Sequence, residues 1–176
     1  MQSSSDDTTY YEGGEFPFRD AKFSGAICIE TLEHVCEPKQ LLAEIFRVLD
    51  DGGTLLISVP WSARRHHVPF DFFRYSPEGL THLLDEAGFV DIKVSSRGSE
   101  AHVIANKLLI FAIGKIKAKK NVTYLLKLVS ILFVVPMLGF WYLMAWINQM
   151  LGVHSDLDPL GYFVIAKCPN LLVSLN

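Results

Sequence analysis

The run from Phe23 to Pro60 constrains the fold of this chain more than any other part of the sequence. Its apolar segment Ala26–Ile29 suits a strand that is buried on both faces. A helical pattern with Pro38 in its first turn follows, and the Asp50–Gly53 turn ends it. Leu55–Val59 is a second apolar strand. Strand, helix and strand in this order predict a parallel βαβ unit of an α/β fold.

Polar side chains follow each of the two predicted strands. Open α/β sheets bind ligands beyond the carboxyl ends of their strands, so these residues are candidates for a site. The residues after the first strand are Glu30, Thr31, Glu33 and His34, and those after the second are Trp61, Ser62, Arg64, Arg65, His66 and His67.

The segments IETLEHVCEP and LLAEIFRVLDDGGTLLISVP resemble the middle motif of small-molecule class I methyltransferases, which use S-adenosylmethionine. The upstream FPFRDAKFSGAI is similar to that family's approach to its fourth strand, although Ser24 stands where the family usually has Asp. The resemblance covers roughly Tyr10 to Phe89 and a last strand near Leu160–Lys167. It implies a Rossmann-like sheet in which the antiparallel strand Gly161–Ala166 lies between the family's fifth and sixth strands.

The family's glycine-rich first motif, GxGxG, does not occur in this sequence. The acidic residue that holds the cofactor's ribose after the second strand has no counterpart either. Two βαβ units need about 30 residues each, which do not fit ahead of the middle motif. We therefore expect an N-terminally truncated fragment that is inactive alone, in which Ala26–Ile29 becomes an edge strand.

The resemblance implies three cofactor-binding candidates. Glu30 would face the methionine and sulfonium end of S-adenosylmethionine, and the alternative is a loop acid in solvent. Ile29 aligns with a cofactor-contacting position, and the alternative is plain strand core. Phe18 lies in the loop that runs beside the adenine in relatives, and the alternative is an aromatic packed on the core.

The substrate-side candidates come from the first polar loop and from the loop after the second strand. A histidine there could act as general base, because its pKa lies near neutrality, or could only support its loop by hydrogen bonding. Asp71 and Arg74 could instead pair to shape the loop. No catalytic residue is assigned, and the substrate-side candidates are His34, His66, His67, Asp71, Arg74 and Tyr75.

Residues 101–151 form an apolar insertion that the family core does not need. It holds two helical patterns, Val103–Ile116 and Val122–Leu151, the second interrupted by Pro136 and Gly139. The resemblance implies that the strands before and after the insertion lie side by side in one sheet, so the number of membrane crossings must be even, and zero counts. We expect an in-plane or re-entrant attachment to the cytoplasmic face of a membrane, with Lys115–Lys120 at the headgroups. The alternatives are a helical cap over the sheet and a dimer interface.

Composition bounds the remaining possibilities. A chain of 176 residues is long enough for one domain, and its net charge of −3 gives no sign of nucleic-acid binding. Its three cysteines lack metal-ligand spacing, so no metal site is expected, and an odd count without CxxC favours reduced thiols in the cytoplasm. The predicted organisation is a disordered segment 1–9, a partial methyltransferase core 10–100, the insertion 101–151, and a last strand with a tail, 152–176.

Two functions follow from these observations. The first is methyl transfer from S-adenosylmethionine to a small acceptor, such as a sugar or lipid-linked hydroxyl, at a membrane surface. The second is a membrane-attached, non-catalytic interaction module derived from a methyltransferase. The sequence predicts neither the acceptor atom nor the oligomeric state.

Overall fold

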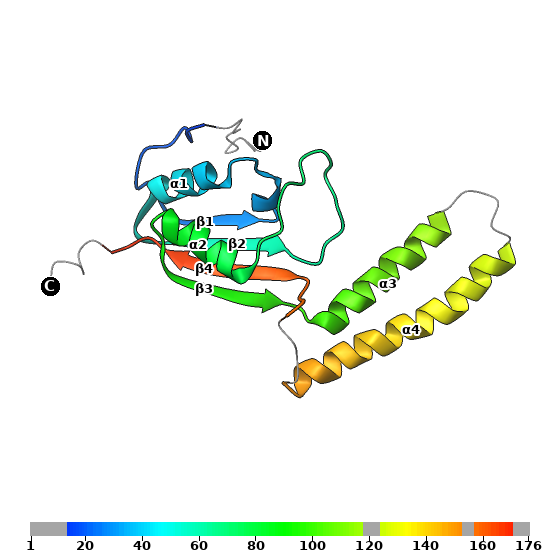
Figure 1. Ribbon diagram of the computed structural model, residues 1–176. Coiled ribbons are helices and arrows are strands. Elements are labelled where there is room, and N and C mark those ends of the chain that lie inside the picture. The colour runs from blue at the N-terminus through cyan, green and yellow to red at the C-terminus, as the bar shows by residue number, and fades with distance from the viewer. Residues whose placement is uncertain (1–13, 118–123, 153–156, 171–176) are drawn as a thin grey trace, which may run out of the picture.

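The computed structural model describes residues 14–117, 124–152 and 157–170, so the predicted disorder of residues 1–9 lies outside the described residues. A four-stranded sheet of order β1-β2-β4-β3 carries two helices on one face, and a helical hairpin projects from one end (Figure 1). The strands are β1 Phe23–Ile29, β2 Leu49–Pro60, β3 Val90–Arg97 and β4 Gly161–Lys167. The helices are the 3₁₀ turn η1 Leu32–His34, α1 Pro38–Val48, α2 Pro77–Glu86, α3 Glu100–Lys117 and α4 Tyr124–Met150.

The predicted βαβ unit is confirmed. β1 and β2 are parallel, with Cys28 opposite Ile57, and α1 connects them with Pro38 in its first turn. β2 begins earlier than expected, at Leu49, directly after the helix. Gly52 makes this sharp reversal possible, because its φ of +74° is in the region that favours glycine.

The last strand lies where the resemblance implied. β4 is antiparallel to both of its neighbours, and its Val164 is opposite Ile57 of β2 and Val94 of β3. β4 therefore lies between the βαβ unit and β3 in the sheet, although the insertion separates β3 from β4 in the sequence. This order brings the carboxyl ends of β1, β2 and β3 to one edge of the sheet.

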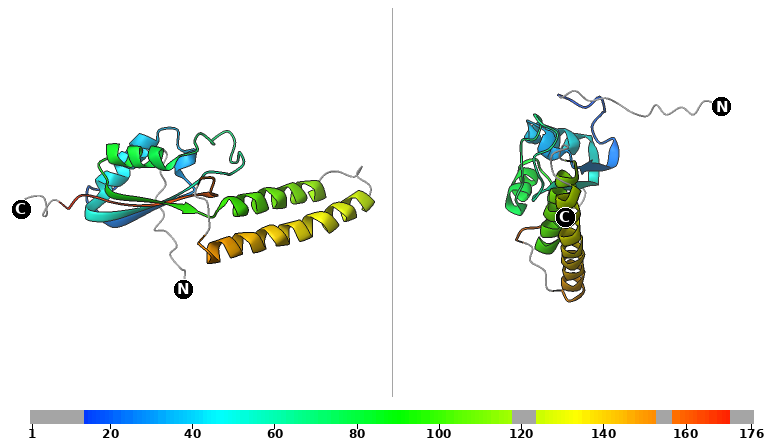
Figure 2. Two further views of the ribbon diagram at one scale, coloured as in Figure 1. Left: turned by 60° about the horizontal axis from the view of Figure 1, so that its bottom comes forward. Right: turned by 90° about the vertical axis from the view of Figure 1, so that its right-hand side faces the viewer.

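Figure 2 shows α1 and α2 as one layer on one face of the sheet, and the hydrophobic core lies between this layer and the sheet. Side chains from both helices pack there on alternate residues of the central strands. The fully buried members of this core include Leu32, Leu42, Leu55, Ile57, Val59, Leu80, Leu84, Val164 and Ala166.

β1 is an edge strand of the described sheet, as expected, but the prediction of burial on both faces is wrong. Cys28 points to the helices and is buried, whereas Ile27 and Ile29 are 69% and 55% exposed on the opposite face. No described helix covers that face, and no described strand pairs with the outer edge of β1. An apolar edge and an apolar face therefore remain open.

The insertion forms two antiparallel helices, α3 and α4, that pack on each other (Figure 1). The expected interruption at Pro136 and Gly139 is wrong, because both lie inside α4, a single helix of 27 residues. A proline removes one helix hydrogen bond, and the turns on both sides keep theirs. The two helices project beyond the sheet, so the expectation of a cap over the sheet is also wrong (Figure 2).

Candidate functional site

Glu30 lies just beyond β1, in a left-handed backbone conformation with φ +48°. Its Oε1 accepts a hydrogen bond from Ser58 Oγ at 2.9 Å and forms an ion pair with Arg97 Nη2, also at 2.9 Å. The side chain is 37% exposed. Ser58 and Arg97 therefore hold Glu30 over the carboxyl edge of the sheet, where its side chain stays partly exposed to solvent.

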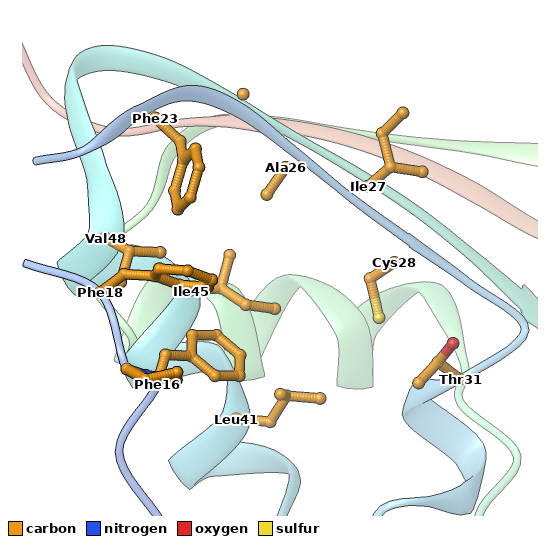
Figure 3. A pocket seen from close by; sticks show the side chains of 12 residues that line it. Phe16, Phe18, Phe23, Ala26, Ile27, Cys28, Thr31, Leu41, Ile45 and Val48 are labelled. Atoms are coloured by element: carbon orange, nitrogen blue, oxygen red, sulfur yellow. The ribbon is translucent and has the colours of Figure 1, made fainter. Parts of the chain in front are cut away.

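Phe18 lies beside an apolar pocket of about 400 Å³ between β1 and α1. Figure 3 shows Phe16, Phe18 and Phe23 on one side of this pocket and Cys28 with Thr31 on the opposite side. The rings of Phe18 and Phe23 meet edge to face, with centroids 5.0 Å apart. The pocket lies along the open edge strand, so Phe18 is available to a planar apolar group that enters there.

An ion-pair network holds the loop that carries Phe18. Arg47 donates to the carbonyl oxygens of Phe16 and Phe18, and it pairs with Glu44 and Asp20. Glu44 also accepts from the amide of Phe16 at 2.6 Å. Hydrogen bonds from Arg47 lower the pKa of the Glu44 carboxyl to about 2. The loop is thus fixed against α1 by charged groups.

Ile29 ends β1 and is 55% exposed, on the face of the sheet away from the helices. The alternative of plain strand core is wrong in this chain. Its side chain remains available to a ligand or to a further structural element.

The loop after β2, residues 61–76, is called the substrate-side loop here. It folds back onto η1 and brings three candidate histidines close together. His34 Nε2 lies 3.1 Å from His66 Nε2, and the ring of His67 lies 5.1 Å from that of His34. The amides of Phe72 and Phe73 donate to the carbonyl oxygen of Glu33. Two segments that lie 32 residues apart in the chain thus form one polar cluster.

Glu33 lies beneath the two histidines. Its side chain is fully buried, and neither carboxylate oxygen has a hydrogen-bond partner among the described residues. Burial raises the pKa of the Glu33 carboxyl above its usual range. The side chain therefore presents a poorly solvated carboxylate to the cluster above it.

Asp71 and Arg74 form the loop-shaping pair that the sequence left as an alternative. Arg74 donates to both Asp71 oxygens, at 2.6 and 3.0 Å, and to the carbonyl oxygen of Arg64 at 3.2 Å. These bonds hold the pKa of the Asp71 carboxyl well below its usual range. Asp71 also accepts from the amide of His66, so the pair positions that histidine.

Tyr75 is separate from the cluster. It is buried in the hydrophobic core, and its hydroxyl donates to the carbonyl oxygen of Leu32 at 3.2 Å. Burial raises the pKa of the Tyr75 hydroxyl. The structure therefore does not bring this candidate to the substrate side.

Sequence reasoning missed Arg97, and it grouped Glu33 with the polar residues at the sheet edge without predicting that its carboxylate is buried. Arg97 ends β3, and the expected pairing of that strand within the sheet could have placed it near Glu30. Glu33 adjoins His34, but its burial depends on how η1 turns, which no local pattern indicates.

Sequence comparisons identify relatives of this chain. The family model described as "Methyltransferase domain" matches residues 8–57. A probable S-adenosylmethionine-dependent methyltransferase of Mycolicibacterium smegmatis is 35% identical over 81 residues, which cover 43% of this chain and 32% of the relative. O-methyltransferase cnsE of Penicillium expansum is 35% identical over 91 residues, 46% of this chain and 33% of the relative. The chain thus spans about a third of the length of these relatives.

The fold is similar to solved methyltransferase structures. One chain of the complex between the Haloferax volcanii Trm112 methyltransferase activator and a methyltransferase matches 88% of this chain with a TM-score of 0.51. The sequence identity is 15%, and the match covers 58% of that chain. Together with the sheet order and the family match, this likeness establishes the fold. The chain is similar to the class I methyltransferases, a family whose cofactor is S-adenosylmethionine, and its residues 8–57 match part of their domain.

Proposed function

We propose that this chain is the carboxyl-terminal part of an enzyme that transfers a methyl group from S-adenosylmethionine to a small acceptor, a sugar or lipid-linked hydroxyl. The observation that carries the proposal is the sheet edge where Glu30, Arg97 and the histidine cluster meet, in a sheet with the antiparallel β4 between β2 and β3. Ligands bind at this edge in open α/β sheets.

The chemistry suits a surface of this kind. Methyl transfer is an in-line displacement in which the acceptor oxygen bonds to the methyl carbon as the carbon–sulfur bond breaks. The acceptor proton leaves to a base, and S-adenosylhomocysteine is the second product. Positioning and electrostatics supply most of the rate, so no covalent nucleophile is required. Glu30 suits the cationic sulfonium, and His34 or His66 suits the departing proton.

The open surfaces of the sheet support the proposal that this chain needs further strands. The outer edge of β1 and the exposed Ile27 and Ile29 are apolar, and an unpaired apolar edge is prone to aggregation. A preceding βαβ segment of a longer chain would cover both, and would bring the glycine-rich loop beside the pocket at Phe18. Without this segment, the chain lacks the glycine-rich loop that forms the main cofactor-binding element of the family.

The test is to read the gene upstream of Met1 and to assay the longer in-frame chain. The proposal predicts an apolar strand followed by GxGxG, and transfer of labelled methyl from S-adenosylmethionine to a hydroxyl in a lipid extract. A stop codon with no such strand, or no transfer by the longer chain, would favour the alternative of a non-catalytic interaction module.

We further propose that the hairpin, α3 with α4, attaches the protein in the plane of the cytoplasmic face of a membrane. α4 contains one window, Ile131–Asn148, that is long and apolar enough to cross a membrane by length and composition, and only 6% of this window is buried. A helix that is apolar all round needs an apolar environment. Exposed aromatic side chains gather on α4, including Phe133, Phe140, Tyr142 and Trp146.

The number of crossings follows from the sheet. β3 precedes the hairpin and β4 follows it, and the two strands pair with each other, so both ends of the hairpin lie on one side of any bilayer. Two crossings would require α3 to span as well, yet α3 carries the exposed Lys107 in its middle and Lys115 and Lys117 at its end. Charged residues at mid-bilayer are costly, so an in-plane arrangement is favoured.

The base of the hairpin lies at the same sheet edge as the polar loops. Arg97 contacts Glu30, and α3 begins three residues later at Glu100. Ser62, in the substrate-side loop, donates to Asp158 at 2.6 Å, just before β4. An acceptor held in the membrane would therefore reach the site over a short distance, which supports a lipid-linked acceptor.

Labelling of single cysteines tests the attachment, in a Cys36→Ser background that removes the exposed native thiol. Cysteines replace Lys93 on β3, Leu157 before β4, and Lys119 in the connection between the helices. In-plane attachment predicts that an impermeant reagent added to intact cells labels none of the three, and that opened cells label all. Labelling of position 119 alone in intact cells would mean two crossings, and full solubility without detergent would refute the membrane.

A further inference from the structure

The cluster of Glu33, His34 and His66 contains more hydrogen-bond acceptors than the described residues can satisfy. η1 supplies Glu33 and His34, and the loop after β2 supplies His66. Glu33 Oε1 lies 3.6 Å from His34 Nε2 and 3.9 Å from His66 Nε2, and the two nitrogens are 3.1 Å apart. Three potential ligand atoms thus face one point from two segments of the chain.

The other nitrogen of each ring determines what these atoms are. His34 Nδ1 lies 2.5 Å from the carbonyl oxygen of Phe70, and His66 Nδ1 lies 2.9 Å from that of Arg64. A carbonyl oxygen only accepts, so each Nδ1 must carry its proton. In the neutral rings both Nε2 atoms then present lone pairs, and they face each other without a proton between them.

The Glu33 carboxylate is the second, independent observation. It is fully buried, and neither oxygen accepts a hydrogen bond from a described residue. A carboxylate without hydrogen bonds is costly to bury, and a cation beside it offsets that cost. The side chain is directed at the two Nε2 lone pairs, so one cation in this position would satisfy all three groups.

The separations fit a small divalent ion. Zinc binds histidine nitrogen and carboxylate oxygen at about 2.0–2.2 Å, which places tetrahedral ligand atoms about 3.3–3.6 Å apart. The observed 3.1, 3.6 and 3.9 Å lie around these values, and the longest requires a shift of a few tenths of an ångström. Nδ1–H bonds to backbone carbonyls also orient metal-binding histidines in known sites.

We propose that Glu33, His34 and His66 bind one Zn²⁺ ion, with at least one coordination position open to solvent. The His66 side chain is 40% exposed, so the ion can enter and can bind an exogenous ligand. The Asp71–Arg74 pair supports the site, because Arg74 holds the Arg64 carbonyl and Asp71 holds the His66 amide. The open position suits an oxygen ligand, whose proton the ion would make more acidic. Only this last step, with the acceptor hydroxyl as that ligand, rests on the proposed function.

The test is titration of the purified chain in detergent with Co²⁺, followed by visible absorption, and then displacement of Co²⁺ by Zn²⁺. The proposal predicts one equivalent with a tetrahedral spectrum, and a Zn²⁺ dissociation constant of about 1 µM or lower. His66→Ala and His34→Ala should each weaken binding at least tenfold. His82→Ala is the matched control, because His82 pairs with a glutamate, Glu86, on α2 but belongs to no cluster of three potential metal ligands among the described residues. It should change binding less than twofold.

Variants at Glu33 can fail to fold because the residue is buried, so the decisive comparison uses the double variant His34→Ala/His66→Ala with circular dichroism as a check. Zn²⁺ should raise the melting temperature of the wild type and leave that of a folded double variant unchanged. Equal Co²⁺ binding by the wild type and the double variant would overturn the proposal. The proposal would also be overturned if the wild type bound neither Co²⁺ nor Zn²⁺ and the two histidines only shared a proton. Both readouts are independent of methyl transfer.

Discussion

Glu30 and Arg97, at the ends of the two outermost strands of the sheet, form an ion pair with a separation of 2.9 Å across the intervening strands β2 and β4. Gly161 allows this crossing, because a Cβ there would lie 2.9 Å from Arg97 Nη2 and 2.4 Å from the carbonyl oxygen of Val59. The Glu30 carboxylate is therefore positioned by residues from β2 and β3 before any ligand binds.

Glu30→Gln should weaken binding of S-adenosylmethionine by tenfold or more in a longer in-frame chain, which corresponds to about 1.4 kcal/mol. The substitution keeps the shape of the side chain and removes the negative charge proposed to face the sulfonium. Calorimetry measures the change, with Glu37→Gln, in the same loop region before α1, as the control. Equal effects of the two substitutions would mean that Glu30 does not face the cofactor.

Tyr75→Phe should lower the free energy of unfolding by about 1 kcal/mol, because it removes one buried hydrogen bond to the Leu32 carbonyl. Urea titration followed by circular dichroism measures this. Tyr142→Phe, on the exposed surface of α4, should change stability by less than about 0.5 kcal/mol. A loss of acceptor binding without a loss of stability would instead place Tyr75 on the substrate side.

Acid should destabilise the fold through Glu44. Its pKa is lowered in the folded state from the usual 4.5 to about 2, so the folded state binds this proton less readily than the unfolded state. The stabilisation is present above pH 4.5 and is lost as the pH falls towards 2. Glu44→Gln should flatten the dependence of stability on pH in this window, whereas the exposed Glu78→Gln should not. An unchanged slope in Glu44→Gln would contradict the role assigned to the Arg47 pair.

Replacing two exposed aromatics of α4 should release the protein from membranes. Phe133 and Phe140 are 70% and 54% exposed, and burial of each in lipid is worth about 1.5–3 kcal/mol. The double variant Phe133→Ser/Phe140→Ser should therefore sediment with anionic vesicles at least tenfold less well than the wild type. Leu157→Ser, at an apolar site that is 87% exposed outside the hairpin, is the control. Unchanged vesicle binding, with loss of a dimer on a sizing column, would identify a protein interface instead.

Sequence patterns predicted the main elements of the fold because each pattern reflects a local physical constraint. Apolar runs indicated the two strands of the βαβ unit, and Pro38 indicated the first turn of the helix between them, where α1 begins. The position of β4 came from the family resemblance, since pairing between distant strands leaves no local signal. The continuity of α4 through Pro136 was missed because the rest of the helix outweighs one lost hydrogen bond.

The site was predictable only in part. The carboxyl-edge rule grouped the loops after β1 and β2, and His34 and His66 do meet there. The partners of individual side chains were not predictable, because they depend on the positive φ of Glu30 and on the turn of η1. Tyr75 illustrates the limit, since it follows the charged, half-buried Arg74 and yet its ring is in the core.

The most direct test of the account is calorimetry of S-adenosylmethionine with this 176-residue chain and with the longer in-frame chain. The account predicts binding no tighter than about millimolar for the 176 residues, because the glycine-rich loop and the ribose acid are missing from the sequence, and micromolar binding for the longer chain. A micromolar dissociation constant for the 176 residues alone, or no binding by the longer chain, would contradict it.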